Sequence, residues 1–82
     1  MPTTDIAAAE LAAGITAFEL MHRAGLVQSK GGARKLIRSG GGRINDRVIA
    51  DEQMKITTDE VAQNGMIKLS AGRKRHALIR PV

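Results

Sequence analysis

The chain is 82 residues long, with 13 Lys or Arg, 8 Asp or Glu and a formal net charge of +5. It contains no cysteine, which excludes disulfides and thiolate metal sites and fits a reducing, cytoplasmic location. No apolar run approaches the ~20 residues that cross a bilayer, so the composition predicts one small domain without a membrane segment.

The charges change sign along the chain in four blocks. Residues 1–22 and 49–67 each carry a net charge of −3, whereas residues 23–48 carry +6 and residues 68–82 carry +5. A fold that brings the two basic blocks together would concentrate positive charge on one face. Such a face favours a polyanionic partner.

The N-terminal residues predict a short helix. Asp5 is a suitable N-cap for a helix over residues 6–13, and Gly14 is suited to end it. The residues before the cap, 1–4, are expected to be loose.

A second helix is predicted from a complete start signal. Thr16 and Glu19 match the capping-box pattern, and Ile15 and Leu20 can form the hydrophobic staple around it. Gly25 suits the left-handed position that ends such a helix.

Ser29 predicts the start of a third helix, which runs to about Ser39 and is stopped by the glycines at 40–42. One flank of this helix carries cations that recur every four residues, namely Lys30, Arg34 and Arg38. A cationic flank of this kind suits a phosphate backbone, but it is equally typical of an ordinary solvated helix face.

The second half of the chain predicts strands. Asn45-Asp46 is a suitable two-residue hairpin turn between short strands, and residues 57–61 can form one capped helical turn. Residues 66–70 alternate as a strand, and residues 73–80 form a last strand after a reversal at Gly72. The predicted fold class is therefore α+β, with N-terminal helices packed on a small antiparallel sheet.

No residues with the spacing of a catalytic or metal site are present. His22 and His76 lie in different elements without a carboxylate or cysteine cluster near them in sequence, and the serines have no recognisable base. The glycines at 40–42 match neither dinucleotide-binding nor P-loop patterns. We therefore expect no catalytic residue, metal or cofactor in this chain, and no enzyme activity from it alone.

Four short motifs follow one another between residues 26 and 48: Ser29-Lys30, Ala33-Arg34, Leu36-Ile37 and Gly41-x-Arg43-Ile44-Asn45. Together they resemble the RNA-binding module named after the fourth protein of the small ribosomal subunit, called the S-four-like module below. Two positions depart from that pattern. Gly32 replaces a glutamate and removes a capping box, and Asp46 replaces the glycine of the turn.

The wider arrangement resembles the C-terminal domain of bacterial tyrosyl-tRNA synthetases, in which the module follows an Ala-Gly-Leu helix end, as at residues 24–26. It also ends on a Gly-Arg/Lys-Lys strand, as at residues 72–82. This resemblance implies an S-four-like (αL-type) fold over residues 15–82, with residues 1–14 as an extension that carries a short helix. It also implies a parent enzyme that is an ATP-dependent tyrosine–tRNA ligase, homodimeric through a separate catalytic domain, whereas the isolated fragment is expected to be monomeric.

The resemblance places the RNA-binding positions on the third helix and the two basic blocks. They are Ser29, Lys30, Arg34, Lys35, Arg38, Arg43, Arg47, Arg73, Lys74 and Arg75. Since the chain has no Tyr or Trp and a single Phe, stacking platforms for bases are missing. The expected partner is structured tRNA, tyrosine tRNA in particular, held through phosphates and 2′-hydroxyls.

Three other interpretations remain open on the sequence alone. The chain could be the same module from another translation or RNA-modifying protein. It could be a protein-interaction domain whose acidic residues 51–60 meet the cations within the fold. It could also bind anionic membranes, although the basic helix lacks the large aromatic residues that favour insertion.

Overall fold

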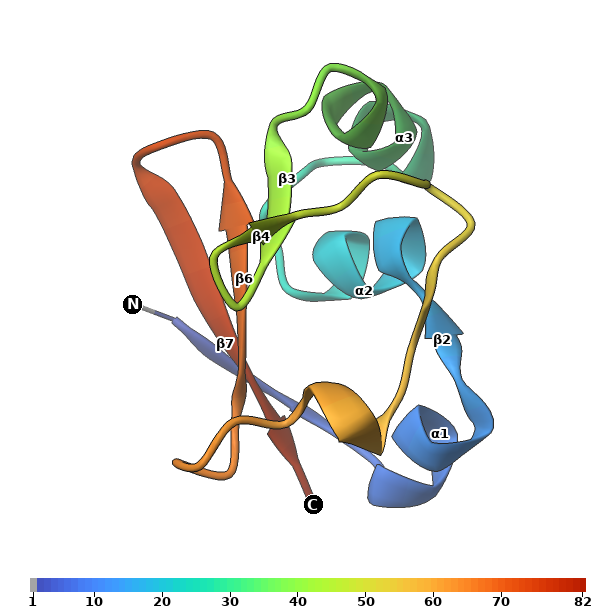
Figure 1. Cartoon of the computed structure of the whole chain (residues 1–82), viewed down its shortest axis with the longest axis vertical. Helices are drawn as coiled ribbons and strands as arrows, with labels where there is room; N and C mark the ends of the chain where they lie inside the picture. Colours follow the sequence, from blue (N-terminus) through green and yellow to red (C-terminus); the bar gives the residue numbers. More distant parts are fainter. Residues whose placement is uncertain (1) are drawn as a thin grey trace.

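A five-stranded mixed sheet with helices on one side organises the structure, a computed structural model that describes residues 2–82 (Figure 1). The elements in chain order are β1 (Thr3–Ile6), α1 (Ala8–Ala13), β2 (Ile15–Thr16), α2 (Ala17–Arg23), α3 (Lys30–Arg38), β3 (Gly42–Ile44), β4 (Arg47–Val48), β5 (Lys55–Ile56), the 3₁₀ turn η1 (Thr58–Glu60), β6 (Ile67–Ala71) and β7 (Arg75–Pro81).

The strand order of the main sheet is β1-β7-β6-β3-β4. β1 runs parallel to β7, and the other neighbouring pairs are antiparallel. β2 and β5 form a separate antiparallel pair. The predicted α+β class is confirmed, but the sheet is mixed rather than wholly antiparallel. The helices are also not all N-terminal to the strands, because β1 and β2 precede α1 and α2.

One face of the sheet is buried under the helices. Side chains alternate between the two faces of a strand, and the residues on the helix side of β6 and β7 are completely buried, namely Ile67, Leu69, Ala77 and Ile79. A Cβ atom added to Gly42 of β3 would lie 3.0 Å from the side chain of Ile37 in α3. The backbone of β3 therefore approaches α3 as closely as a glycine allows.

The N-terminal prediction is wrong in part, because residues 3–6 form strand β1 instead of a loose end and a helix start. The helix begins at Ala8, without a side-chain cap. Asp5, the predicted cap, accepts two hydrogen bonds from Arg80 of β7, at 2.7 and 3.1 Å. These bonds hold the pKa of the Asp5 carboxyl below its ordinary value. Gly14 ends α1 as predicted, and Met1 lies outside the described residues.

The capping box of α2 does not form, although Thr16 is the N-cap residue. Thr16 belongs to β2, and the amide of Ala17 donates to the carbonyl oxygen of Met54 at 2.9 Å. The start of the helix is thus satisfied by a distant segment. The carboxylate of Glu19 is free to turn to the ammonium group of Lys30, 3.3 Å away.

The predicted end of α2 is confirmed. Gly25 has a φ of +76°, and its amide donates to the carbonyl oxygen of His22 at 3.1 Å. The amide of Leu26 donates to the carbonyl oxygen of Met21 at 3.2 Å, which completes a Schellman motif. This motif turns the chain sharply and directs it into α3.

The limits of α3 are also confirmed. The amide of Gly32 donates to Ser29 Oγ at 3.0 Å, so Ser29 caps the helix as predicted. Ser39 is the C-cap residue, and Gly40 follows with a φ of +81°. The pair Gly31-Gly32 does not prevent the first turn from forming.

Both predicted turns after α3 are present. Asn45 and Asp46 have φ values of +49° and +68°, as a two-residue hairpin of the primed type requires. Thr57 Oγ1 accepts a hydrogen bond from the amide of Asp59 at 3.3 Å and starts η1. The last hairpin turns at Gly72, and its second strand begins at Arg75, two residues later than predicted.

Candidate nucleic-acid interface

Helix α3 presents four exposed cations. Three of them lie on the flank that faces α2 and residues 51–53, and each has a partner there. Lys30 is 3.3 Å from Glu19, and Arg38 is 3.0 Å from Glu52. The guanidinium carbon of Arg34 lies 4.3 Å from the centre of the Phe18 ring. This flank is exposed, but its cations are held by contacts within the fold.

The fourth cation of α3, Lys35, lies further round the helix and faces the β6–β7 hairpin. Between α3 and the hairpin is a hollow of about 530 Å³. Lys35 and Arg75 are among the residues that line it, one from each basic block of the sequence. The aliphatic residues that line it are Leu26, Val27, Leu36 and Ala71.

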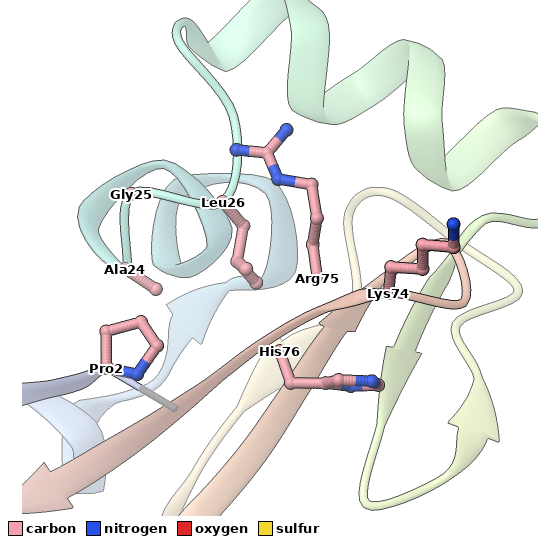
Figure 2. Close-up of a pocket in the computed structure, with 7 residues that line it drawn as sticks. All are labelled: Pro2, Ala24, Gly25, Leu26, Lys74, Arg75 and His76. Carbon is pink, nitrogen blue, oxygen red and sulfur yellow. The ribbon is translucent and has the colours of Figure 1, made fainter.

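A second hollow of about 480 Å³ adjoins the first, since Leu26 and Arg75 line both. Lys74 also lines it, together with Pro2 and the end of α2. Figure 2 shows the side chains of Lys74 and Arg75 directed toward α3, whereas His76 lies on the other side of the strand. The fold thus brings the middle of the second basic block beside the helix of the first.

His76 ties the β6–β7 turn to the sheet. Its Nε2 lies 3.2 Å from the carbonyl oxygen of Arg73, and its Nδ1 lies 2.8 Å from Ser70 Oγ. Because a carbonyl can only accept, Nε2 of the neutral ring donates to it and Nδ1 accepts from the Ser70 hydroxyl. Ser70 is only 2% exposed, so this bond satisfies a buried hydroxyl and fixes the base of the turn.

Arg43 and Arg47 are not brought onto the face that holds Lys35 and Arg75. Arg43 lies opposite Ser70 in the β3–β6 pair. It follows Gly42, which faces the helices, and since side chains alternate along a strand, the Arg43 side chain points to the sheet face away from the helices. Arg47 lies on the edge strand β4, where its guanidinium is 2.6 Å from Glu60. Both side chains are exposed.

The distribution of carboxylates leaves the hairpin cations unneutralised. Of the 8 Asp and Glu residues, six form ion pairs, and the cations that they hold are Arg23, Lys30, Arg38, Arg47, Lys68 and Arg80. The hydrogen bond from Arg23 holds the pKa of Glu10 below its ordinary value. Within residues 2–82, no carboxylate lies within ion-pair distance of Lys35 or of the turn residues 73–75.

Residues of the acidic segment 51–60 form ion pairs with two of the predicted RNA-binding cations, Arg38 and Arg47. The idea that this segment neutralises basic residues within the fold therefore holds for these two positions. It does not hold for Lys35 or residues 73–75. The positive surface that remains is centred on the hollow between α3 and the β6–β7 turn.

No pattern in the sequence indicated the hollow itself or the Ser70–His76 pair. Of the two leucines that line the hollow, Leu26 is buried, whereas Leu36 is only partly buried. The alternation of a strand would place Arg75 and His76 on opposite faces, which is observed. The proximity of Arg75 to α3 depends on the strand order β7-β6-β3, which no local pattern specifies.

No group of three or more His, Cys, Asp or Glu residues in the range 2–82 could hold a metal ion. None of the helices described here has the length and apolar character needed to cross a membrane.

Comparison with known proteins finds relatives that share the same name, tyrosine–tRNA ligase. No protein-family model matches the chain. It is 54% identical over 80 residues to the tyrosine–tRNA ligase of Rickettsia peacockii (strain Rustic), covering 98% of this chain and 20% of that protein. It is 49% identical over 81 residues to that of Nitrobacter winogradskyi, covering 99% of the chain and 19% of the relative.

The tyrosine–tRNA ligase of Rickettsia bellii is 59% identical over 70 residues, or 85% of the chain and 17% of that protein. The chain thus spans about a fifth of the length of the curated relatives that it matches. Across nearly its whole length, it is a homologue of the C-terminal segment of tyrosine–tRNA ligases.

Proposed function

We propose that this chain is the tRNA-binding terminal segment of a tyrosine–tRNA ligase and has an S-four-like fold over residues 15–82. Residues 1–14 are an extension, which packs on the module through β1 and α1. The relatives supply the context of the ligase, and the order α2-α3-β3-β4 agrees with the motifs that suggested the module.

The observation that carries the proposal is the cluster of unneutralised cations around the hollow between α3 and the β6–β7 turn. Lys35, Lys74 and Arg75 come from both basic blocks, are exposed, and have no carboxylate partner in the described chain. Neighbouring cations without counter-charges repel each other, and a polyanion relieves that repulsion. We infer that this surface holds the RNA backbone.

The contacts around that centre differ in strength. Arg34, Lys30 and Arg38 lie next to Lys35 around α3, but Glu19 and Glu52 compete with phosphate for two of them. Arg73 lies in the turn, and Ser29 begins the helix, where the first backbone amides favour an anion. Arg43 and Arg47 are on other sides of the molecule, so they reach only an RNA large enough to extend past β3 and β4.

Binding of this kind recognises the shape of a structured RNA. The one Phe is 9% exposed and packs under Arg34, so it offers no open stacking surface. Phosphate and 2′-hydroxyl contacts remain, and these suit a tRNA stem. We propose tyrosine tRNA as the partner, in the cytoplasm and with no role for a membrane.

The rest of the ligase would perform the chemistry. We propose that ATP and tyrosine are bound by a separate catalytic domain, through which the parent dimerises, while this segment alone is monomeric and contributes no cofactor site. Its role is then to orient the tRNA.

The proposal predicts tRNA binding that depends steeply on salt. Four to six phosphate contacts give a log–log slope of about −3 to −5, at ~0.7–0.9 per contact. Titration of the 82-residue chain with tyrosine tRNA and with a tRNA that has a short variable arm, at several salt concentrations, measures this slope and the selectivity. Equal affinity for both tRNAs would favour an S-four-like module of another translation or RNA-modifying protein. Binding unaffected by salt would contradict the electrostatic account.

A second expectation concerns a tyrosine–tRNA ligase that carries this segment. Removing the segment should leave tyrosine-dependent and ATP-dependent adenylate formation near normal, while charging of tRNA falls sharply. The segment added in trans should restore little, because the covalent link supplies an effective concentration in about the millimolar range. Pyrophosphate exchange and tRNA charging measure the two steps, and an equal loss of both would contradict the division of labour.

A further inference from the structure

The hollow between α3 and the β6–β7 turn is lined by aliphatic side chains that contacts to phosphates do not use. Leu26, Val27, Leu36 and Ala71 form the aliphatic part of its lining, and Lys35, Ser39 and Arg75 form the polar part. A phosphate placed against the aliphatic residues would lose water without gaining a donor from them. The two cations suit phosphates, and the aliphatic residues suit an apolar, flat group.

The two cations that line the hollow come from different elements. Lys35 belongs to α3 and Arg75 to β7, and Lys74 lines the adjoining hollow. In Figure 2 the Arg75 side chain rises beside Leu26 toward α3. A strand that crosses the hollow can therefore place consecutive phosphates near these cations, with its base directed between them.

Open space adjoins two glycines of this region. A Cβ added to Gly25 or Gly72, next to the two hollows, would find no atom within 4 Å, so each has free space beside it. No carboxylate of residues 2–82 lines either hollow. At about 530 Å³, the hollow is an open depression of the surface and not an enclosed pocket.

We propose that this hollow receives the base of one unpaired nucleotide next to a stem, while Lys35 and Arg75 hold the phosphates on either side. The inference rests on the proposed RNA-binding function and deepens it. The RNA recognised by the chain would then include an unpaired nucleotide, either extruded from a stem or at a junction, in addition to the backbone of a helix. Because the walls offer aliphatic contact rather than base-edge hydrogen bonds, the hollow accepts any of the four bases with little discrimination.

The test compares three RNA duplexes of about 16 base pairs, the span that duplex-binding domains cover. The first is fully paired, the second has one additional unpaired nucleotide at its centre, and the third has an abasic residue at that position. The bulged duplex should bind the chain roughly five- to tenfold more tightly than the paired one, the effect expected from burying about 40–55 Å² of apolar surface. The abasic duplex, which keeps the backbone bend, should bind like the paired one.

Variants of the protein test whether the hollow is responsible. Val27→Trp and Ser39→Phe fill it from two different lining positions, and Ser39 is exposed, so that at least this variant is expected to fold. Both should remove the preference for the bulge and leave binding of the paired duplex within about twofold. Gln28→Trp, at an exposed position outside the lining, is the matched control and should keep the preference.

Equal binding of the paired and bulged duplexes by the unmodified chain would overturn the inference, as would a preference that survives in the filled variants or with the abasic residue. Each of these results leaves the proposed function intact, because the chain still binds RNA. Absence of binding to all three duplexes and to tRNA would instead contradict the proposed function itself.

Discussion

Reversing the charge of both Lys35 and Arg75 is expected to reduce tRNA affinity by a factor on the order of 100 at about 0.1 M salt. The double variant Lys35→Glu/Arg75→Glu removes two phosphate contacts and places like charges against the backbone. Both side chains are exposed and unpaired, so their replacement breaks no ion pair of the folded protein. Binding isotherms and circular dichroism of the same samples measure affinity and fold.

The matched control is Lys55→Glu, which makes the same change of charge on β5, at a residue that lines neither hollow. It should lower affinity only slightly, through net charge. Arg38→Glu should have an intermediate effect, because Glu52 already neutralises part of that charge. Similar losses for Lys55→Glu and for a single reversal at Lys35 would show that binding follows net charge and not this surface.

Ile37→Ala is expected to cost about 2–5 kcal/mol in the free energy of unfolding, the usual range for a buried Ile shortened to Ala. Ile37 is 3% exposed and packs directly on the backbone of β3 at Gly42. For a domain of this size, such a loss is a large part of the total stability and lowers the Tm by more than about 10 °C. Thermal or urea unfolding measures it.

The control lies one position earlier on the same helix. Leu36 is only partly buried and lines the hollow, so Leu36→Ala should destabilise the fold clearly less than Ile37→Ala. Equal losses for the two would contradict the packing of α3 on β3 described here.

Local signals in the sequence correctly predicted most turns and helix ends. Ser29 and Gly25 act through hydrogen bonds to residues at most five positions away, which a sequence pattern can contain. The Asn45-Asp46 turn is similar, since its φ values depend on two adjacent residues. Motifs whose hydrogen bonds join residues close in sequence are predictable, because near neighbours supply the interactions that stabilise them.

The errors occurred where a distant segment competes with a local motif. Asp5 could cap a helix, but Arg80 and strand β7 offer it two charged hydrogen bonds and a parallel partner. Thr16 and Glu19 match a capping box, yet β5 satisfies the backbone there and Lys30 attracts the carboxylate. Sequence patterns do not contain these long-range partners.

The candidate site was predictable in composition but not in shape. The sequence identified the cations, and all ten candidate residues are exposed. It did not indicate that Glu52 and Glu60 hold Arg38 and Arg47, or that Arg43 faces away from the helices. Those facts follow from the strand order and leave Lys35 and the β6–β7 turn as the centre of free positive charge.

Amide chemical-shift mapping by NMR tests this account most directly. Isotope-labelled chain is titrated with tyrosine tRNA, and the shift changes are assigned to residues. The account predicts that the largest changes fall in residues 26–39 and 72–76, around the hollow between α3 and the β6–β7 turn. Largest changes in residues 43–48 and 55–64, with little change around the hollow, would contradict it.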